Sequence, residues 1–422
     1  MTTNPKRLPT IATNKGKIPA VVGWLDNGVG PSLCRALFKH GVPIVALVRS
    51  KNNVECKTRY VRQVIEVPEG DAGIIDALNA NSNLFPEGAV FCPTNDALAH
   101  IINSQQKRLS STYKIGSPDP ATLALLGDKS KVNDLLVRAK ILHPKTGSIS
   151  SKNEIPAIVE GCRYPVIVKP SVKSTAWWDA LHKKAIRAES PESLIRILNR
   201  CLGLAPSLIV QEWIDGPDSN MYSFYSYVGK NGNLLAGLTC QKLRQAPAAT
   251  GVGSIAMQCE EPRVSEPSLR LIQESGFRGL SSMQFKRREG TQDYYFIEAN
   301  VGRPGLNTPV AEACGVELQY TMYCDCADLP LPTDRYVRFP GAKAVVWKLD
   351  LNRSLEGILS GEISVLDWLS TLTGRVRSID IHLDDPKVLS VRLIRSVKKN
   401  TRKMAARLLD RNNTRTRKAT KA

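Results

Sequence analysis

The sequence of 422 residues contains no run of about 18 apolar residues, although its apolar share of 42% is ordinary for a globular protein. A membrane-spanning helix is therefore not expected. Residues 1–17 include basic residues but no apolar segment that ends in a small-residue cleavage site, so we expect a mobile tail there and no secretory signal. A chain of this length can form two or three domains with sizeable cores.

Patterns typical of disulfides and of structural zinc sites are also missing. None of the ten cysteines belongs to a C-x-x-C pair, and the five histidines are isolated. Cys324 and Cys326 are too close for an ordinary disulfide and lack further ligands at zinc spacing. We therefore expect reduced thiols in a cytoplasmic protein. No nucleophile and histidine pairing that would indicate covalent catalysis is recognisable.

Acidic residues are outnumbered, 39 against 58 Lys and Arg, which gives a net charge of +19. Residues 392–422 hold 12 Lys or Arg and one Asp, so this tail alone carries 12 − 1 = +11 and the other 391 residues carry +8. The tail begins as an amphipathic pattern, which fits a helix packed on the core with a solvated basic face. The alternative is a peripheral contact with an anionic membrane at the inner face of the cell. Nucleic-acid binding is not expected, because the tail has neither interleaved aromatic residues nor a recognition motif.

Residues 18–48 read as strand, turn, helix and strand, the βαβ unit of a parallel sheet. Residues 88–96, "GAVFCPTND", repeat this plan with a buried strand followed by polar residues. The "GVG" after the first strand is only part of G-x-G-x-x-G. It predicts a tight turn that lets the helix pack on the strand, and no NAD site is inferred.

The segment "YYFIEANVGRPG", residues 294–305, is a hydrophobic strand that ends in polar side chains. With the strand before it, it reads as a hairpin whose turn is centred near Thr291, so that Gln284 lies opposite Glu298. Glu298 and Asn300 share a face because strand side chains alternate. Three side-chain oxygens would then converge, and oxygens are the ligands that magnesium prefers. The same residues are also compatible with a solvent-facing polar edge.

A further segment, "LIVQEWIDGPD" at 208–218, changes the balance between these two interpretations. Together with "VIVKP" upstream and "FIEAN" downstream, it resembles the ATP-grasp superfamily in the order of its motifs. The segments "KLRQ…GVGS", "PTND" and "GEISVLDWLSTLTG" followed by "DDPKVL" resemble the D-aspartate-ligase-like subgroup of carboxylate–amine ligases. This resemblance covers most of residues 18–391.

The resemblance implies a role for each matching residue. Gln211 and Glu212 would lie at the adenine, the backbone of Trp213 and Ile214 would clamp the base, and Asp218 would bind the ribose. Phosphates would be held by Lys129 and Lys169, and Glu298, Asn300 and Gln284 would bind metal. The catalytic cations implied are Arg303, which steadies the transferred phosphate, and Lys242 and Arg244, which meet phosphate or acyl phosphate.

The resemblance also implies the fold class, α/β, with a Rossmann-like parallel sheet followed by a two-part α+β ATP-grasp domain. We expect a tail at 1–17, an N-terminal domain at 18–120, the ATP-grasp domain at 121–335, a C-terminal segment packed on it at 336–391, and the basic tail at 392–422. The segment 241–254 is a candidate lid, although a plain β-hairpin loop fits the same residues.

Two departures from the superfamily pattern matter. Gln284 stands where many relatives have a carboxylate, so metal binding should be weaker, or one of two ions should be lost. The segment "PSVKSTAWW" after Lys169 lacks the glycines that cradle phosphates in many relatives, a feature that the subgroup shares.

The resemblance implies a cytoplasmic ligase that uses ATP and Mg²⁺ to join a carboxylate to an amine through an acyl phosphate. Its substrates would be small molecules or cell-envelope precursors. Two alternatives stay open: an ATP-binding protein with little turnover that docks on an acidic polymer or membrane, and a phosphotransferase. The sequence identifies neither the substrates nor the oligomeric state.

Overall fold

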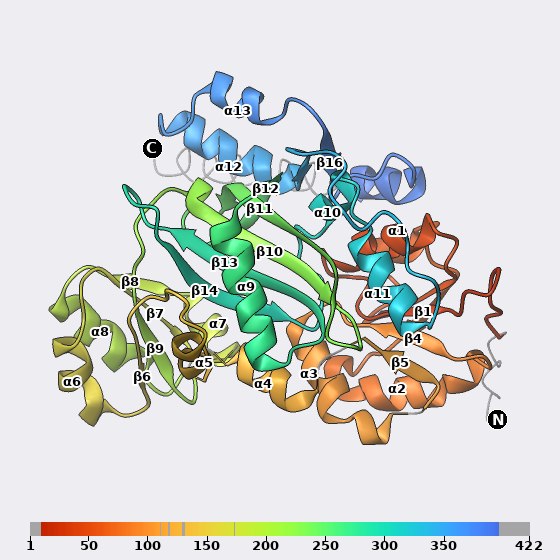
Figure 1. The fold of residues 1–422 in the computed structure, drawn as a ribbon, viewed down its shortest axis with the longest axis horizontal. Helices are drawn as coiled ribbons and strands as arrows, with labels where there is room; N and C mark the ends of the chain where they lie inside the picture. The colour runs from red at the N-terminus through yellow and green to blue at the C-terminus, as the bar shows by residue number, and fades with distance from the viewer. Residues whose placement is uncertain (1–9, 110, 117–118, 129–130, 173, 396–422) are drawn as a thin grey trace, which may run out of the picture.

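The structure is a computed structural model that describes residues 10–395 except 110, 117–118, 129–130 and 173. Figure 1 shows a small lobe on one side, a large central sheet, and an N-terminal sheet on the other side of the central sheet. The helices of the C-terminal segment lie along one edge of the central sheet. Within the described part of the chain, no helix combines the length and the apolar character needed to cross a membrane.

The N-terminal sheet has five parallel strands in the order β3-β2-β1-β4-β5. The predicted βαβ unit and the repeat around "PTND" are confirmed, since β1 pairs in parallel with both β2 and β4. A Cβ at Gly30 would lie 2.6 Å from the carbonyl oxygen of Trp24, which explains the glycine in the tight turn. The strands and helices of this region are β1 (Ala20–Val22), α1 (Gly30–Phe38), β2 (Ile44–Val48), β3 (Gln63–Glu66), α2 (Ile74–Ala80), β4 (Ala89–Cys92), α3 (Asp96–Ser104) and β5 (Tyr113–Ile115).

The small lobe is a four-stranded antiparallel sheet in the order β6-β9-β7-β8, covered by α6 and α8 (Figure 1). Its core consists of alternate residues of these strands and the apolar face of α8, whose start is fixed by the Ser190 capping box. The elements from the connection onwards are α4 (Pro120–Gly127), α5 (Val132–Arg138), β6 (Thr146–Ile149), α6 (Ile155–Glu160), β7 (Val166–Pro170), α7 (Thr175–Leu181), β8 (Ile186–Ala188), α8 (Pro191–Cys201) and β9 (Leu208–Glu212).

The central sheet has seven strands in the order β14-β13-β10-β11-β12-β15-β16. One face packs on α9, α4 and α5, and the other meets the core of the N-terminal sheet. Two strands of this sheet, β15 and β16, come from the C-terminal segment. The elements are β10 (Met221–Val228), β11 (Leu234–Ala246), β12 (Val252–Cys259), α9 (Pro262–Ser275), β13 (Gly279–Arg287), β14 (Tyr294–Val301), α10 (Pro309–Ala313), α11 (Leu318–Cys326), β15 (Lys343–Val345), α12 (Trp347–Leu359), α13 (Val365–Thr371) and β16 (Val376–Ser378).

Short 3-10 helices complete the connections. They are η1 (Val54–Lys57), η2 (Gly70–Gly73), η3 (Ser82–Leu84), η4 (Gln106–Arg108), η5 (Lys152–Glu154) and η6 (Asp218–Asn220).

Two predicted elements differ from the structure. The helix expected over residues 128–143 with Asp128 as its cap is the shorter α5, and Asp128 follows α4. The helix ends early because Lys140 adopts a left-handed φ of 53°, after which the backbone turns back. The strand expected over 342–349 ends at Val345. The helix α12 begins two residues later, at Trp347.

The chain termini leave parts of the prediction outside the structure. The tail at 1–17 is described only from residue 10, and the basic tail only up to residue 395. Residues 386–395 are helical, and Arg392 pairs with Glu55 at 2.6 Å. Leu393 and Ile394 remain 64% and 53% exposed, so the described start of the tail is docked by its arginine and not by these apolar residues. All ten cysteines are unpaired, as expected.

Candidate active site

The predicted metal strand is β14, and its pairing with β13 places Gln284 directly opposite Glu298, as the sequence predicts. The ladder shifts between Gln284 and Phe285, because Phe285 pairs with Phe296 and leaves Ile297 as an extra residue. Asn300 lies opposite Ser282, one step further along the same face. The amide of Asn300 donates to Glu298 Oε1 at 3.1 Å. The structure therefore brings the predicted metal ligands together on one face of the hairpin.

Arg303 follows β14 and reaches back to this group. Its Nη2 donates to Asn300 Oδ1 at 2.9 Å, and its Nε pairs with Asp96 Oδ1 at 2.6 Å. Asp96 closes the "PTND" segment at the end of β4 in the N-terminal sheet, so two sheets meet at this arginine. Sequence analysis recognised the segment but did not assign a role to Asp96, which holds the guanidinium beside the metal strand.

Lys242 lies on β11 and is only 7% exposed. Its Nζ donates to Gln284 Oε1 at 3.1 Å and to Gln245 Oε1 at 3.4 Å. Burial lowers the pKa of Lys242 to about 8, and the negative charge of Glu298 partly opposes this. The structure thus places Lys242 beside two of the three predicted metal ligands.

Arg244, two residues after Lys242 on β11, binds a different partner. Its guanidinium makes two parallel hydrogen bonds, each 2.9 Å long, to Asp350 on α12, and a third to Thr371 at 2.8 Å. Asp350 is fully buried and also accepts from Ser254 and Trp368. Arg244 therefore ties the β11–β12 hairpin to the C-terminal helices, and its predicted contact with phosphate stays a prediction.

The predicted phosphate lysine of the small lobe lies next to the predicted adenine residue. Lys169 on β7 donates to Gln211 Oε1 on β9 at 2.8 Å, and Gln211 Nε2 donates to Thr146 Oγ1 at 3.0 Å. Because Gln211 Nε2 donates to Thr146, the amide oxygen Oε1 faces Lys169. The role of Thr146 was not predicted from the sequence. Lys129, the second predicted phosphate lysine, lies outside the described residues.

Residues 212–214, at the end of β9 and directly after it, are each fixed by a contact or by burial. Glu212 pairs with Arg288 at 2.7 Å, and the Trp213 amide donates to the Pro165 carbonyl at 3.1 Å, while Ile214 is buried. Since the Trp213 amide is engaged, a clamp on a base from this residue would use its carbonyl.

The Trp213 ring is flanked by two cations, with Lys286 Nζ and Arg187 Cζ each 4.8 Å from its centroid. Lys286 lies two residues after Gln284 on β13 and therefore shares its face. It is 6% exposed, and burial lowers its pKa against the attraction of Asp218 and Asp215. Sequence analysis did not include Lys286, although its period-two spacing from Gln284 could have indicated it.

Asp218, the predicted ribose ligand, organises the loop between β11 and β12. Its carboxylate accepts from the Gln245 amide at 2.9 Å, from Gln245 Nε2 at 3.0 Å and from the Ala249 amide at 2.9 Å. The segment 241–254 forms the facing ends of β11 and β12 and the loop that joins them. Its role as a lid stays a prediction.

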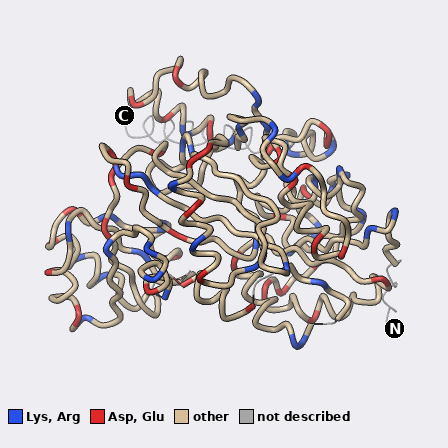
Figure 2. The backbone as a smooth tube through the Cα atoms, viewed as in Figure 1, with Lys and Arg blue, Asp and Glu red and all other residues tan. Residues whose placement is uncertain are grey.

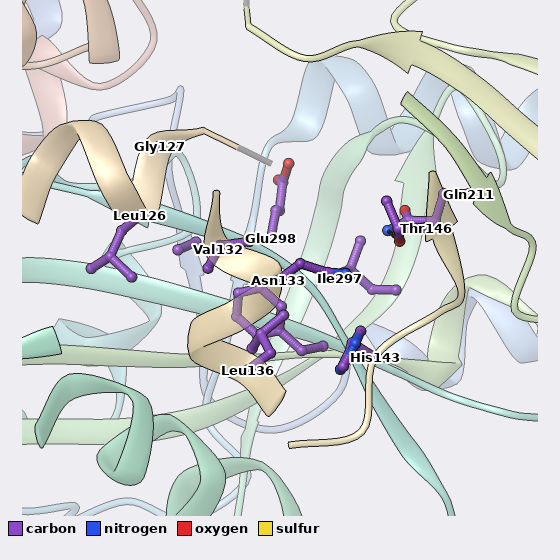
Figure 3. Close-up of a pocket in the computed structure, with 12 residues that line it drawn as sticks. Leu126, Gly127, Val132, Asn133, Leu136, His143, Thr146, Gln211, Ile297 and Glu298 are labelled. Carbon is purple, nitrogen blue, oxygen red and sulfur yellow. Dashed lines mark hydrogen bonds between the residues drawn. The ribbon is translucent and has the colours of Figure 1, made fainter. Parts of the chain in front are cut away.

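A small pocket, partly open to solvent, lies where the small lobe faces the central sheet. Figure 3 shows the Glu298 carboxylate on one side of it and Gln211 with Thr146 on the other. In Figure 2, Lys and Arg positions lie between the small lobe and the central sheet, with Asp and Glu positions among them. No cluster of three or more His, Cys, Asp or Glu that could hold a metal ion occurs among the described residues.

Comparison with solved structures identifies the fold. Biotin carboxylase from Campylobacter jejuni in complex with β-γ-ATP superimposes with a TM-score of 0.61 at 15% identity, covering 78% of this chain and 75% of that one. An ADP complex of N5-carboxyaminoimidazole ribonucleotide synthetase gives 0.62 at 13% identity, over 84% and 86% of the two chains. L-amino acid ligase from Bacillus licheniformis gives 0.55 at 14% identity, over 77% of each.

These structures share the ATP-grasp fold, and the chain described here has that fold. The predicted ATP-grasp fold and fold class are thereby confirmed. Membership of the superfamily and of its D-aspartate-ligase-like subgroup stays a prediction. No family model and no curated protein sequence matches the chain. The predicted domain boundaries and the roles of the individual site residues stay predictions.

Proposed function

We propose that this protein is an ATP-dependent ligase that joins a carboxylate to an amine. One observation carries the proposal: two buried lysines, Lys242 and Lys286, lie on the face of the central sheet that also bears Glu298. A buried cation is costly unless an anion offsets its charge. Glu298 and Asp218 attract Lys242, and Asp218 and Asp215 attract Lys286, yet burial still lowers the pKa of both lysines. The phosphates of a nucleotide would supply further negative charge beside them.

The side chains of the metal strand suit magnesium. Glu298 offers a carboxylate and Asn300 an amide oxygen with a second lone pair beyond the one that Arg303 uses. When bound there, the ion would neutralise charge on the nucleotide phosphates. The similar biotin carboxylase and N5-carboxyaminoimidazole ribonucleotide synthetase are complexes with β-γ-ATP and ADP, and the biotin carboxylase domain of Hydrogenobacter thermophilus 2-oxoglutarate carboxylase holds MgADP. These ligands support ATP and magnesium as the ligands here.

The remaining cations would position and stabilise the transferred phosphoryl group. Lys169 donates to Gln211, which lines the pocket from the small lobe, and Arg303 donates to Asn300, two residues after the pocket residue Glu298 on β14. Phosphoryl transfer asks mainly for alignment and charge stabilisation, so a site of cations without an activated nucleophile suits it.

The reaction proposed has two steps. A substrate carboxylate oxygen attacks the γ-phosphorus and ADP leaves, which gives an acyl phosphate. An amine then attacks the acyl carbon, phosphate leaves with its bonding electron pair, and the amine loses a proton as the amide forms. The substrates proposed are small molecules or cell-envelope precursors that carry these groups.

Two assays test this proposal. Amino acids and small carboxylates are screened in pairs for stimulated ADP formation, and hydroxylamine is then added in place of the amine. A ligase gives ADP that depends on the carboxylate, together with a hydroxamate from the trapped acyl phosphate. ADP without hydroxamate would indicate a phosphotransferase instead.

Gln284 favours a second candidate, an ATP-binding protein with little turnover that docks on an acidic polymer or membrane. A neutral amide replaces a negative charge beside the metal strand, which should weaken metal binding. Nucleotide binding without ADP formation under any pair of substrates would favour this candidate over the ligase.

A further inference from the structure

The three predicted metal ligands are not equivalent in the structure. Glu298 is charged, Asn300 is a neutral amide beside it, and Gln284 is a neutral amide whose oxygen already accepts a hydrogen bond from a buried ammonium. The Lys242 Nζ to Gln284 Oε1 distance is 3.1 Å, an ordinary hydrogen bond from an ammonium group.

Lys242 has little freedom to leave this position. Its side chain is 7% exposed, and its Nζ is also 3.4 Å from Gln245 Oε1. Gln245 is itself fixed, because its backbone amide and its side-chain Nε2 both donate to Asp218. The ammonium therefore lies in a cradle of two amide oxygens, next to the Glu298 carboxylate that attracts it.

A divalent ion on Gln284 would have to share that oxygen with the ammonium. Two cations would then be separated by only a few ångströms in a buried site, where their repulsion is poorly screened. Gln284 brings no negative charge to offset it, and a carboxylate at this position would. The position opposite Glu298 is therefore suited to the lysine and poorly suited to a second metal ion.

We propose that the site takes one divalent cation with its nucleotide, at Glu298 and Asn300, and that the Lys242 ammonium supplies the second positive charge. This inference rests on the proposed function, since it concerns the nucleotide site of that function. It assigns Gln284 to holding Lys242 and removes it from the metal ligands that the sequence predicts.

Equilibrium dialysis with Mn²⁺ and the non-hydrolysable nucleotide AMPPNP tests the proposal without any turnover. The concentrations of Mn²⁺ and AMPPNP on the protein side are measured at saturation and corrected for the free Mn²⁺–AMPPNP complex. We expect one AMPPNP and one Mn²⁺ bound per chain. One AMPPNP with two Mn²⁺ would overturn the inference while leaving the proposed function in place. No bound AMPPNP would overturn both.

Two variants separate the role of the lysine from that of the amide. In Lys242→Met the ratio of Mn²⁺ to AMPPNP should stay at one while the AMPPNP affinity falls about tenfold or more, because a charge-assisted contact is lost. In the Lys242→Met, Gln284→Glu double variant the ratio should rise towards two. A ratio of one in a folded double variant, checked by circular dichroism, would contradict the proposed replacement.

Discussion

At the scale of single residues, the candidate site is a set of charges that a folded protein alone would not favour. Lys242 donates to Gln284, Lys286 lies over the Trp213 ring, and Lys169 donates to Gln211. Burial lowers the pKa of the first two lysines, as expected of cations that would receive a bound anion in the proposed function.

If the proposed function holds, the substitution Glu298→Gln should lower ADP formation by about 10²–10³-fold, because it removes the charged ligand proposed to hold the metal against the phosphates. The isosteric change should leave the thermal unfolding temperature nearly unchanged. Glu274→Gln, at an exposed position on α9, serves as the matched control. ADP release at the wild-type rate from the Glu298 variant would contradict the metal assignment.

His382 should make the stability of the protein depend on pH. Burial lowers its pKa to about 4, with repulsion from Arg35 and Arg392 added and attraction from Asp384 opposing it. The pKa of His382 is lower in the folded state than the unfolded value of about 6.5, so protonation favours the unfolded state. The contribution of the neutral imidazole to the free energy of unfolding is therefore fully present above pH 6.5 and is lost as the pH falls towards 4.

The shift of the pKa corresponds to about 3 kcal/mol in the free energy of unfolding over the whole window, of which about 2 kcal/mol is lost by pH 5. Urea unfolding at pH 7.5, 6 and 5 measures it, with His382→Asn as the comparison. The wild type should lose stability relative to this variant as the pH falls. Parallel pH profiles of the two proteins would show that His382 is not responsible.

At the scale of elements, the hairpin β13–β14 explains how far sequence reasoning can reach. The pairing of Gln284 with Glu298 follows from strand alternation and was predicted correctly. The extra residue Ile297 was not, because a bulge leaves no pattern in a short apolar strand. Between the bulge and the turn, Phe285 pairs with Phe296. The midpoint of this pair lies half a residue before Thr291, where the turn was predicted.

The second element-scale feature is the junction between β11 and α12, formed by Arg244 and Asp350. These residues are 106 positions apart in the chain, so no local pattern predicts that they meet. The motif around Arg244 indicated a phosphate contact, whereas the structure shows an ion pair that fixes the hairpin carrying Lys242.

Asp350→Asn should lower the free energy of unfolding by about 3–5 kcal/mol, because it breaks a fully buried ion pair and leaves the guanidinium without its partner charge. Denaturant titration measures the loss. Glu356→Gln, exposed on the same helix, should change the free energy by less than about 0.5 kcal/mol. Equal effects of the two substitutions would contradict the structural role of Asp350.

At the scale of the whole molecule, the site is assembled from three sheets. The small lobe contributes Lys169, and the central sheet contributes Glu298 and Lys242. The N-terminal region contributes Asp96, the first residue of α3 after β4, which pairs with Arg303. The order of motifs was sufficient to predict the ATP-grasp fold. It could not reveal the link between Asp96 and Arg303, which joins residues 207 positions apart.

Asp96→Asn should lower the rate of ADP formation by about 10- to 100-fold, because Arg303 loses the partner that positions it at the phosphoryl group. The affinity for AMPPNP should change far less, which separates positioning from binding. Asp76→Asn removes a surface ion pair of the same N-terminal region and should leave both quantities unchanged. An unaltered rate in the Asp96 variant would show that the link between the sheets does not serve catalysis.

A crystal structure of the protein soaked with Mg²⁺ and AMPPNP tests the central claim most directly. The account predicts one magnesium ion bound by Glu298 and Asn300, with the nucleotide phosphates completing its coordination and Lys242 still bonded to Gln284. A nucleotide bound elsewhere, or an ordered nucleotide whose metal touches neither Glu298 nor Asn300, would contradict it.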